Sequence, residues 1–554
     1  MTSHNKFTIL YYINLVKGTV GMGIYLNPGN ERFARVLRSK IYVDKTGMLE
    51  YLNSALDTEQ SCICVSRPRR FGKSITADML AAYYGVGCDS REMFAKYKAA
   101  ELSDFSEHLN KYQVIQIDVN TFRHRRDSVT GETITAMQTV GLFHTEVIRE
   151  LRQQFPQSVG ENDNDLPSVL AKINEDTGEK FVIIIDEWDT IFREDKYDEK
   201  AQEAYINLLR GLFKDSTSKN FLKLAYITGI LPIKKYGTQS ALNNFREYTM
   251  IMPGRLAEYI GFTEEEVRHL CEQYDMDFEE TKRWYDGYSF RKIKHIYNPN
   301  AVVNAMLDGE FNNYWTRTET YETLKNYITM NFEGLKDDVV QMLTGGHCKV
   351  NPGKFQNDMV SVKSKDDVLT LLLHLGYLAY DADRKEVYIP NEEVKDEFRN
   401  AVEETGWDTV IQAIATSDTL LRATWQKDSD AVAAAIDRVH SENTSILNYN
   451  DENALSCVIT LAYYNAVNEY TIIRELPTGY GFADMVFLPK KNSDRPALLV
   501  ELKWNQTAQG AIDQIKNKQY VQSLKEYQGN LLLVGINYDK GSKKHQCIIE
   551  QMEV

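Results

Sequence analysis

The sequence predicts an α/β protein that is built from several structural units. Short β-branched runs alternate with amphipathic helical stretches between Ile41 and about Leu231, which is typical of a mostly parallel sheet with helices on both faces. Helical patterns dominate from Gly261, and near Leu420 strands and helices begin to alternate again. Since an average domain has about 150 residues, a chain of 554 residues is expected to hold three or four units.

These changes of pattern divide the chain into four parts. Residues 1–21 are an appendage, 22–260 form the domain with the parallel sheet, 261–420 form a mainly helical middle region, and 421–554 form a C-terminal α/β domain. The middle region opens with the capping box Thr263–Glu266 and is a candidate connector, substrate platform or contact within a homo-oligomer. The expected strands are Cys62–Ser66, Val114–Val119, Phe181–Asp186, Phe221–Thr228, Thr471–Leu476, Ala483–Phe487, Ala497–Leu502 and Asn530–Ile536.

The charge balance excludes a protein that holds nucleic acid through bulk positive charge. The chain has 64 Lys and Arg against 79 Asp and Glu, a net charge of −15, whereas counterion release needs a basic face. Residues 451–554 contain 11 Lys and Arg against 12 Asp and Glu, so the acidic excess lies in the preceding 450 residues. A local basic groove or a metal-bridged contact with nucleic acid therefore remains compatible with the sequence.

Cysteine usage and hydropathy favour the cytoplasm. The seven cysteines are scattered, and no C-x-x-C pair occurs among them, so neither a disulfide framework nor a structural zinc site is expected. No stretch reaches the roughly 18 apolar residues of a membrane span. The apolar run Phe7–Val16 lacks the flanking features of a signal peptide. We therefore expect a cytoplasmic protein without a membrane partner.

A phosphate-binding loop is predicted after the strand Cys62–Ser66. The segment Ser66–Ser74 has the sequence Ser-Arg-Pro-Arg-Arg-Phe-Gly-Lys-Ser and precedes a helix. Between a strand and a helix, the tripeptide Gly72-Lys73-Ser74 indicates phosphate binding. Backbone N–H groups at a helix N-terminus bind phosphate oxygens, the lysine reaches the β- and γ-phosphates, and the serine hydroxyl ligates Mg²⁺. Alone, a Gly-Lys-Ser tripeptide is also common by chance.

A second motif supports ATP binding and hydrolysis. The apolar strand Phe181–Asp186 ends in Asp186 and Glu187, which are predicted to hold the Mg²⁺ shell and to polarise an attacking water, respectively. The alternative is a purely structural role, in which Asp186 caps a helix that begins at the end of the strand. Thr228, at the end of a further strand, is a candidate sensor of the γ-phosphate, although a terminal threonine is often only a cap.

Three arginines flank the predicted phosphates. The usual loop pattern has glycine five residues before Gly72, and Arg67 stands there instead. Arg67, Arg69 and Arg70 are candidates for neutralising phosphate charge. Compensation for the missing glycine or pairing with nearby acids would explain them equally well.

The C-terminal part contains a possible metal-dependent nuclease site. Glu501 and Lys503 are two residues apart on one strand and so share a face, and Asp484 on the preceding strand can converge on them. Two carboxylates suit Mg²⁺ or Mn²⁺, and a lysine beside them can orient or deprotonate water for attack on a phosphodiester. An exposed ion pair would explain Glu501 and Lys503 in isolation.

Two further elements support this site. Gln514 and Tyr520 lie on a predicted helix, Gln509–Leu524, that could reach back over the carboxylates. Glu452, on the helix before the strands, is a candidate to complete the metal shell.

The chain resembles the bacterial AAA-ATPase-like family, whose members carry a C-terminal domain of the PD-(D/E)XK nuclease superfamily. The resemblance rests on the run Ile41–Thr46, the loop Arg67–Ser74, the segment Asp186–Asp189 and the aromatic cluster Trp284–Tyr288, and it extends from Met22 to the end. Arginine in place of the first loop glycine is usual in that family. The resemblance implies that Gly72, Lys73, Ser74, Asp186 and Glu187 bind ATP and that Asp484, Glu501 and Lys503 form the nuclease triad.

Together these patterns predict a P-loop ATPase domain, a helical middle region and a restriction-endonuclease-like α/β domain. We expect ATP and Mg²⁺ as cofactors, with Mn²⁺ as an alternative at the nuclease site, and nucleic acid, DNA foremost, as substrate. One alternative is an ATP-dependent switch or scaffold whose nuclease-like domain binds without cleaving. Another is a small-molecule kinase, which leaves the C-terminal residues unexplained.

Overall fold

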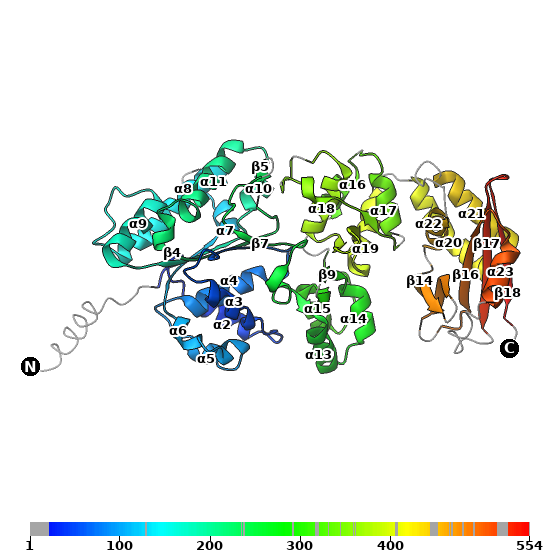
Figure 1. Ribbon diagram of the computed structural model, residues 1–554, viewed down its shortest axis with the longest axis horizontal. Coiled ribbons are helices and arrows are strands. Elements are labelled where there is room, and N and C mark those ends of the chain that lie inside the picture. The colour runs from blue at the N-terminus through cyan, green and yellow to red at the C-terminus, as the bar shows by residue number, and fades with distance from the viewer. Residues whose placement is uncertain are drawn as a thin grey trace, which may run out of the picture. The chain divides into compact units, whose positions relative to one another are not determined.

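The computed structural model groups the chain into two compact units (Figure 1). The first contains residues up to 318 together with 349–394, and the second contains 319–348 together with 395–554. The middle region expected at 261–420 is thus shared between the two units. The structure describes residues 22–127, 130–233, 235–236, 239–290, 293–315, 321–330, 332–343, 345–357, 359–360, 362–404, 408–443, 452–464, 466, 469–478, 481–490, 493–517 and 530–552.

The first unit is built on a five-stranded parallel sheet with the order β2-β3-β4-β1-β7. The strands are β1 (Cys62–Ser66), β2 (Gln113–Asp118), β3 (Phe181–Asp186), β4 (Leu222–Gly229) and β7 (Arg246–Tyr248). The four strands expected from the sequence are confirmed to within a residue. β7 was missed because three residues with exposed or half-buried Arg246 and Glu247 give no apolar run.

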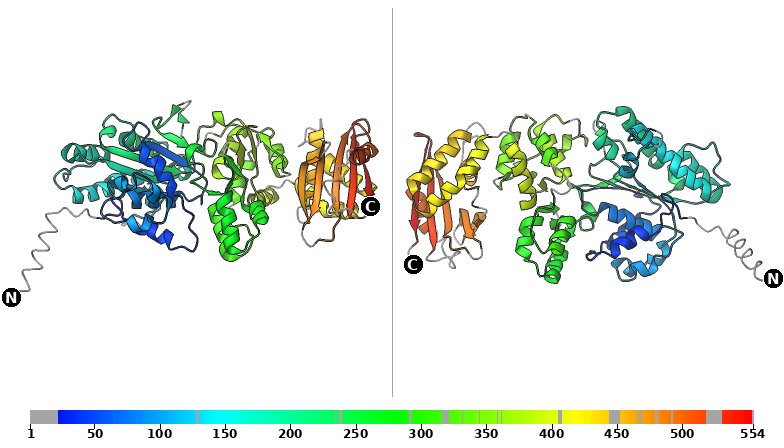
Figure 2. Two further views of the ribbon diagram at one scale, coloured as in Figure 1. Left: turned by 60° about the horizontal axis from the view of Figure 1, so that its bottom comes forward. Right: turned by 180° about the vertical axis from the view of Figure 1, so that it is seen from behind.

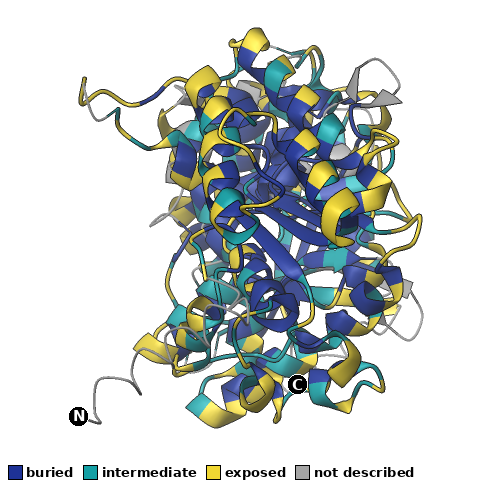
Figure 3. Ribbon diagram, turned by 90° about the vertical axis from the view of Figure 1, so that its left-hand side faces the viewer, coloured by how far each residue is buried: buried dark blue, intermediate teal, exposed yellow. Residues whose placement is uncertain are grey.

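Helices cover both faces of this sheet, which explains why its central strands are apolar without alternation. One face packs on α8, α9 and α11 through Ile183, Ile185 and their neighbours, and α4 lies against the other face (Figures 1 and 2). Figure 3 shows the buried strands between helices whose outer residues are exposed. The helices are α2 (Glu31–Leu37), α3 (Leu49–Ala55), α4 (Lys73–Tyr84), α5 (Arg91–Phe94), α6 (Phe105–His108), α7 (Val119–Arg123), α8 (Ala136–Gln154), α9 (Leu166–Thr177), α10 (Thr190–Glu194), α11 (Glu199–Phe213) and α12 (Ser218–Phe221).

The rest of the first unit combines helices with short antiparallel strands. The capping box at Thr263 and Glu266 is confirmed at the start of α13 (Glu264–Tyr274). β8, β10 and β9 form a three-stranded sheet, and β12 pairs with β13. The elements are β5 (Lys235–Tyr236), β6 (Gln239–Ser240), β8 (Phe262–Thr263), α14 (Phe278–Tyr285), β9 (Tyr288–Phe290), β10 (Ile293–Tyr297), α15 (Pro299–Asp308), α18 (Lys365–Leu375), β12 (Ala379–Asp381) and β13 (Glu386–Tyr388). The helix α19 (Glu392–Glu404) begins in this unit and continues into the second.

The second unit contains a mixed five-stranded sheet with the order β14-β15-β16-β17-β18. Its single parallel pair, β16 with β17, is connected through the helix α23, as a parallel connection requires. α23 packs on β16 and β17, whereas α21 packs on β18 and α22 on β16. The elements are α16 (Tyr321–Ile328), α17 (Leu335–Leu343), α20 (Asp408–Trp425), α21 (Ser429–Asn443), α22 (Glu452–Ala462), β14 (Tyr470–Thr478), β15 (Gly481–Pro489), β16 (Ala497–Trp504), α23 (Ala508–Asn517), β17 (Leu531–Asp539) and β18 (Lys544–Gln551), with β11 (Cys348–Lys349) at the border of the units.

The strands expected in this unit are confirmed, with bounds that differ from the expected ones by at most three residues. β18 was not expected, because its residues alternate between exposed and buried at the edge of the sheet. Across the residues that the structure describes, no helix is both long and apolar enough to span a membrane.

The aromatic cluster Trp284–Tyr288 ends in a close backbone approach that only glycine permits. Gly287 has φ +116°, and a Cβ at this position would collide with the carbonyl oxygen of Pro390. Tyr388 Oη donates to Gly287 O at 2.8 Å, and Asn391 Nδ2 donates to Asp286 O at 2.7 Å. This contact joins β9 to the turn that follows β13.

Gly287→Ala is expected to destabilise this region by about 3 kcal/mol, because strain and a backbone clash add together. The matched control is Gly309→Ala, where φ is +70° but a Cβ would meet nothing within 4 Å, so that only about 1 kcal/mol of conformational strain applies. The local free energy of opening, from native-state hydrogen exchange of β9 and β10 amides, measures both. Equal effects of the two substitutions would contradict the close approach.

Candidate functional sites

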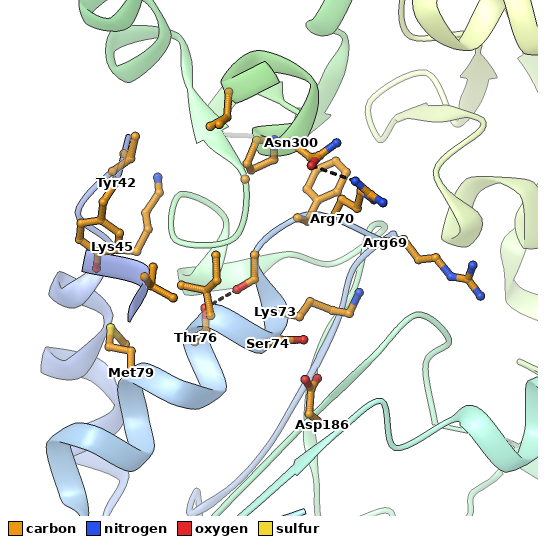
Figure 4. Close-up of a pocket in the computed structure, with 18 of the residues that line it drawn as sticks. Tyr42, Lys45, Arg69, Arg70, Lys73, Ser74, Thr76, Met79, Asp186 and Asn300 are labelled. Atoms are coloured by element: carbon orange, nitrogen blue, oxygen red, sulfur yellow. Dashed lines mark hydrogen bonds between the residues drawn. The ribbon is translucent and has the colours of Figure 1, made fainter. Parts of the chain in front are cut away.

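A cavity of about 910 Å³ opens at the carboxyl end of the first sheet (Figure 4). Ligands bind at this edge of parallel α/β sheets, where the loops after the strands meet. The lining comes from the loop after β1, the ends of β2 and β3, segment 36–45 and parts of 259–307. The predicted residues that line it are Arg69, Arg70, Gly72, Lys73, Ser74, Asp186 and Glu187.

The start of α4 and the end of β3 bring Lys73, Ser74 and Asp186 together. Gly72 caps α4 with φ +88°, so the helix begins at Lys73 with its N-terminus at the cavity. Figure 4 shows the side chains of Lys73, Ser74 and Asp186 directed into the same space. Lys73 Nζ donates to Pro68 O at 3.0 Å and lies 3.7 Å from Glu187 Oε1. A buried ammonium at a helix N-terminus makes this a site for an anion.

The Asp186 carboxyl is buried at the end of β3, and its environment disfavours the charged form. Burial and the neighbouring Glu187 raise the pKa of Asp186 to about 7, while a hydrogen bond from the Ser74 hydroxyl and the charge of Lys73 act in the opposite direction. A bound cation would relieve this electrostatic cost. Asp186 is therefore placed to share a cation with Ser74.

Glu187 is held in a braced turn directly after β3. Its φ of +52° is a left-handed conformation that costs about 1–3 kcal/mol unless other contacts fix it. Arg193 Nη2 donates to Glu187 Oε2 at 2.6 Å, and Arg193 Nε donates to Asp189 Oδ2 at 3.0 Å. Asp189, fully buried, also accepts from the backbone N–H groups of residues 230 and 231 after β4. The carboxylate of Glu187 is thus aimed at the cavity by a fixed network.

Two of the predicted nucleotide-site residues lie away from the cavity. Arg67 is fully buried, and its Nη1 donates to the carbonyl oxygens of Ser66 and Tyr248 at 2.9 and 3.1 Å. Thr228 is fully buried as well, and its hydroxyl donates to Val65 O at 2.9 Å. The structure does not bring either side chain to the space where Lys73 and Ser74 point.

The cavity also contains residues that sequence reasoning missed. Asp118 ends β2 at the level of Asp186, and Arg193 lies on α10, which follows Glu187. Lys45 lies in the lining, with its Nζ 2.6 Å from Glu266 Oε2, and Arg70 Nη1 donates to Asn300 Oδ1 at 3.0 Å. The position of Asp118 at a strand end was a usable signal. Lys45 and Asn300 meet residues more than 200 positions away, which no local pattern reveals.

The second candidate site lies on the face of the mixed sheet that α23 covers. β15 and β16 are antiparallel with Met485 opposite Val500, and continuing this register by one residue places Asp484 opposite Glu501. Directly opposite residues share a face. The Asp484 carboxylate accepts from the backbone N–H of Leu502 at 2.7 Å. The antiparallel pairing of β15 with β16 therefore brings Asp484 to Glu501, as expected from their places on successive strands.

Glu501, Lys503 and Gln514 converge beside Asp484. Glu501 is only 1% exposed, and its Oε1 accepts from Lys503 Nζ at 3.2 Å and from Gln514 Nε2 on α23. Burial and then the Asp484 charge raise the pKa of Glu501 to about 7, while Lys503 lowers it. Glu501 Oε2 is buried and has no hydrogen-bond partner among the described residues. An acceptor of this kind, next to a second carboxylate, fits a cation.

Two further predicted residues of this site lie outside what the structure describes. Glu452 begins α22, but its side chain is not among the described parts, and Tyr520 lies outside the described residues.

Both sites offer hard oxygen donors, which are the ligands that Mg²⁺ and Mn²⁺ prefer. They are Ser74, Asp186 and Glu187 at the first site, and Asp484 and Glu501 at the second. No cluster of three or more His, Cys, Asp and Glu side chains suited to a metal occurs in the described parts of the chain. A cation at either site would therefore take further ligands from water or substrate.

Both sites lie within stretches of the chain that match known families. Residues 29–238 match the family described as "Predicted AAA-ATPase", and residues 450–547 match the PD-(D/E)XK nuclease superfamily. The chain carries an AAA-ATPase-like domain and a C-terminal PD-(D/E)XK nuclease-superfamily domain. The phosphate loop and Asp186 lie within the ATPase-like domain, and Asp484, Glu501 and Lys503 lie within the nuclease-like domain.

Individual proteins add little to this assignment. An uncharacterized protein encoded in the vnfD 5′ region of Azotobacter chroococcum mcd 1 is 27% identical over 314 residues, which cover 54% of this chain. The chain spans about half (55%) of the length of that relative. The ORC2 protein of Aeropyrum pernix, solved as ADPNP–ADP complexes, covers 68% of this chain and 93% of its own at 11% identity and a TM-score of 0.27. PCH-2 of C. elegans covers 68% of each chain at 9% identity and a TM-score of 0.18. Scores this low assign neither function nor ligand.

The raised pKa of Glu501 makes the stability of the nuclease-like domain depend on pH. Between about pH 4.5 and 7 the folded state binds the proton more tightly than the unfolded state, so stability falls as the pH rises through this window. Glu501→Gln is expected to remove this dependence and to stabilise the domain by up to about 3 kcal/mol at pH 8. Hydrogen exchange of β16 and β17 amides, corrected for intrinsic rates, measures the effect. A control, Asp513→Asn on the exposed side of α23, is expected to leave the pH dependence unchanged.

Proposed function

We propose that the protein binds and hydrolyses ATP at the first site, and that its nuclease-like domain cleaves phosphodiester bonds of nucleic acid with a divalent metal. The observation that carries the first part is the convergence of Lys73, Ser74, Asp186 and Glu187 in one cavity at the carboxyl edge of a parallel sheet. The second part rests on Asp484, Glu501, Lys503 and Gln514, which converge from two strands and a helix.

The ATPase site supports in-line hydrolysis. The N-terminus of α4 and Lys73 bind the β- and γ-phosphates, and Lys73 leaves Pro68 O to do so. Ser74 and Asp186 hold Mg²⁺, which offsets phosphate charge when it is bound with the nucleotide. Glu187, restrained by Arg193, orients the attacking water and accepts its proton. Arg69 and Arg70 line the cavity and add positive charge beside the triphosphate.

Lys73→Ala is expected to weaken ATP binding roughly 100-fold, because it removes a charge-assisted contact with the phosphates. Glu187→Gln is expected to keep the affinity and to lose most hydrolysis. Calorimetric titration with Mg²⁺–ATP and phosphate release measure the two quantities separately. As a control, Lys516→Ala removes an exposed lysine of the other unit and leaves both unchanged. If Lys73→Ala binds ATP like the wild type, the site is wrongly assigned.

In the nuclease-like domain, Asp484 and Glu501 hold the metal and Lys503 orients the water that attacks the scissile phosphate. Gln514 fixes the Glu501 carboxylate from α23. A divalent cation held by these two carboxylates would offset the negative charge that develops on the scissile phosphate. Since residues 451–554 are almost neutral overall, and a cation offsets part of the remaining acid, the net charge of the chain is compatible with a nucleic-acid substrate.

Asp484→Ala and Lys503→Ala are each expected to abolish Mg²⁺- or Mn²⁺-dependent cleavage of DNA, since both act on the reacting phosphate or its metal. Linear and structured DNA and RNA are compared by gel, with and without ATP, to show whether ATP controls cleavage. Asp513→Asn is the matched control, because it removes an exposed carboxylate one residue from Gln514. Cleavage that persists at wild-type rate in Asp484→Ala would falsify the nuclease assignment.

One observation favours the alternative of a nuclease-like domain that binds without cleaving. Glu501 Oε1 is already engaged by both Lys503 and Gln514, and the raised pKa of Glu501 favours its protonated form below about pH 7. Nucleic-acid binding that is independent of Mg²⁺ and Mn²⁺, with no cleavage by the wild type, would support this alternative.

A further inference from the structure

Arg67, which stands where the usual phosphate loop has glycine, is buried without a carboxylate partner among the described residues. Its guanidinium lies over the ring of Phe290 in β9, 5.0 Å from the centroid, and Nη1 bonds the carbonyl oxygens of Ser66 and Tyr248. Nε and Nη2 have no hydrogen-bond partner in the described part of the chain. Burial lowers the pKa of Arg67 to about 10, so the side chain is still charged near neutral pH. A buried charge is retained only where its surroundings stabilise it, and here these surroundings are two carbonyls and an aromatic face.

The neighbouring loop residues contact the same part of the middle region. Gly376, which ends α18 with φ +91°, approaches Pro68 so closely that a Cβ on Gly376 would come within 2.7 Å of Pro68 Cβ. The ring of Phe71 packs edge-on against Tyr288 of β9, with centroids 5.3 Å apart. Tyr288 Oη in turn donates to Gly376 O at 2.7 Å. We call Tyr288, Phe290 and Gly376 the bracing surface.

The loop faces the cavity on its other side. Lys73, which binds phosphate in the proposed function, donates to Pro68 O at 3.0 Å. Pro68 is therefore held between the Lys73 ammonium and Gly376 of the bracing surface. When the Lys73 ammonium moves to a triphosphate, its hydrogen bond to Pro68 O is broken. Pro68, which packs against Gly376, then loses one of the two contacts that hold it.

We propose that Arg67 is a positioning residue that fixes the phosphate loop to β9, so that a nucleoside triphosphate in the cavity changes the mobility of the bracing surface. Arg67 does this with contacts that glycine could not make: two carbonyl hydrogen bonds at the ends of β1 and β7, and a cation–π contact with Phe290. The part of this inference that concerns the nucleotide rests on the proposed ATP binding. The fixation of the loop to β9 does not.

The decisive substitution is Arg67→Gly, which restores the standard phosphate-loop pattern. If the loop requires only that pattern, affinity for ATP stays the same or improves. On our proposal, affinity falls about tenfold, which corresponds to about 1.4 kcal/mol. Calorimetric titration with Mg²⁺–ATP in a Glu187→Gln background measures it without turnover. An unchanged or tighter dissociation constant for Arg67→Gly overturns the proposal.

Three further variants separate positioning from simple packing. Phe290→Leu should weaken ATP binding in the same direction as Arg67→Gly but less, and the double variant should bind no more weakly than Arg67→Gly alone, because that substitution already removes the contact with Phe290. Arg67→Lys keeps the charge and should recover part of the affinity. Arg67→Met keeps most of the volume without the charge, and should retain the unfolding temperature but not the affinity. Additive losses, or full recovery by Arg67→Met, contradict the proposal.

Hydrogen exchange distinguishes failure of this inference from failure of the proposed function. Without nucleotide, amides of β9 should exchange faster in Arg67→Gly and Phe290→Leu than in the wild type, and amides of β17 serve as the internal reference. Addition of ATP should alter β9 exchange in the wild type and not in Lys73→Ala. If calorimetry shows no ATP binding while the nucleotide-free effect is present, the proposed function is wrong and the fixation stands. If ATP binds but β9 exchange does not respond, the coupling of the nucleotide to the bracing surface is wrong. If β9 exchange is unchanged without nucleotide, the fixation is wrong.

Discussion

The register of the parallel sheet is the constraint on which the ATPase-like site depends. It sets Asp118 and Asp186, the last residues of β2 and β3, at one level with Thr228 near the end of β4, and the loop after β1 passes over that level beside them. Apolar residues buried on both faces of the strands fix this register. A shift of one strand along its neighbour would disrupt its packing against the helices on both sides of the sheet. The position of the Asp186 carboxylate relative to Ser74 is therefore determined by the core of the domain and not by the loop alone.

The two sites share an electrostatic feature, although one lies at the edge of a parallel sheet and the other on a mixed sheet. Each buries a carboxyl group whose pKa is raised to about 7 by burial and by a second carboxylate, Glu187 beside Asp186 and Asp484 beside Glu501. In each, a lysine offsets part of that cost: Lys73 in the first site and Lys503 in the second. If a metal cation binds at these sites as proposed, it would replace the proton of such a group, and its binding would depend on pH near neutrality.

Sequence reasoning succeeded where a residue's role follows from its strand or helix. The buried runs of β1 and β3, and the pairing of Asp484 with Glu501 across a hairpin, follow from period and spacing. The sequence could not show whether a loop side chain points into the core or into the cavity. Arg67 and Arg69 are two residues apart in one loop, yet Arg67 is buried over Phe290 while Arg69 lines the cavity. It also could not find Lys45 with Glu266 or Arg70 with Asn300, because these contacts join distant segments and arise only when the middle region packs on the loop.

The interleaving of the two units has a practical consequence for dissecting the protein. The chain passes from one unit to the other near residues 318, 348 and 394, so neither unit is a continuous stretch. A fragment that begins at residue 421 would lack residues 319–348 and 395–420 of its own unit and would cut α20, which packs on α21 and α22. Such a fragment would expose the surfaces of α21 and α22 that α20 covers and would be prone to aggregate for reasons unrelated to its active site. Separate study of the nuclease-like domain therefore requires a fragment that retains the whole of α20 from Asp408.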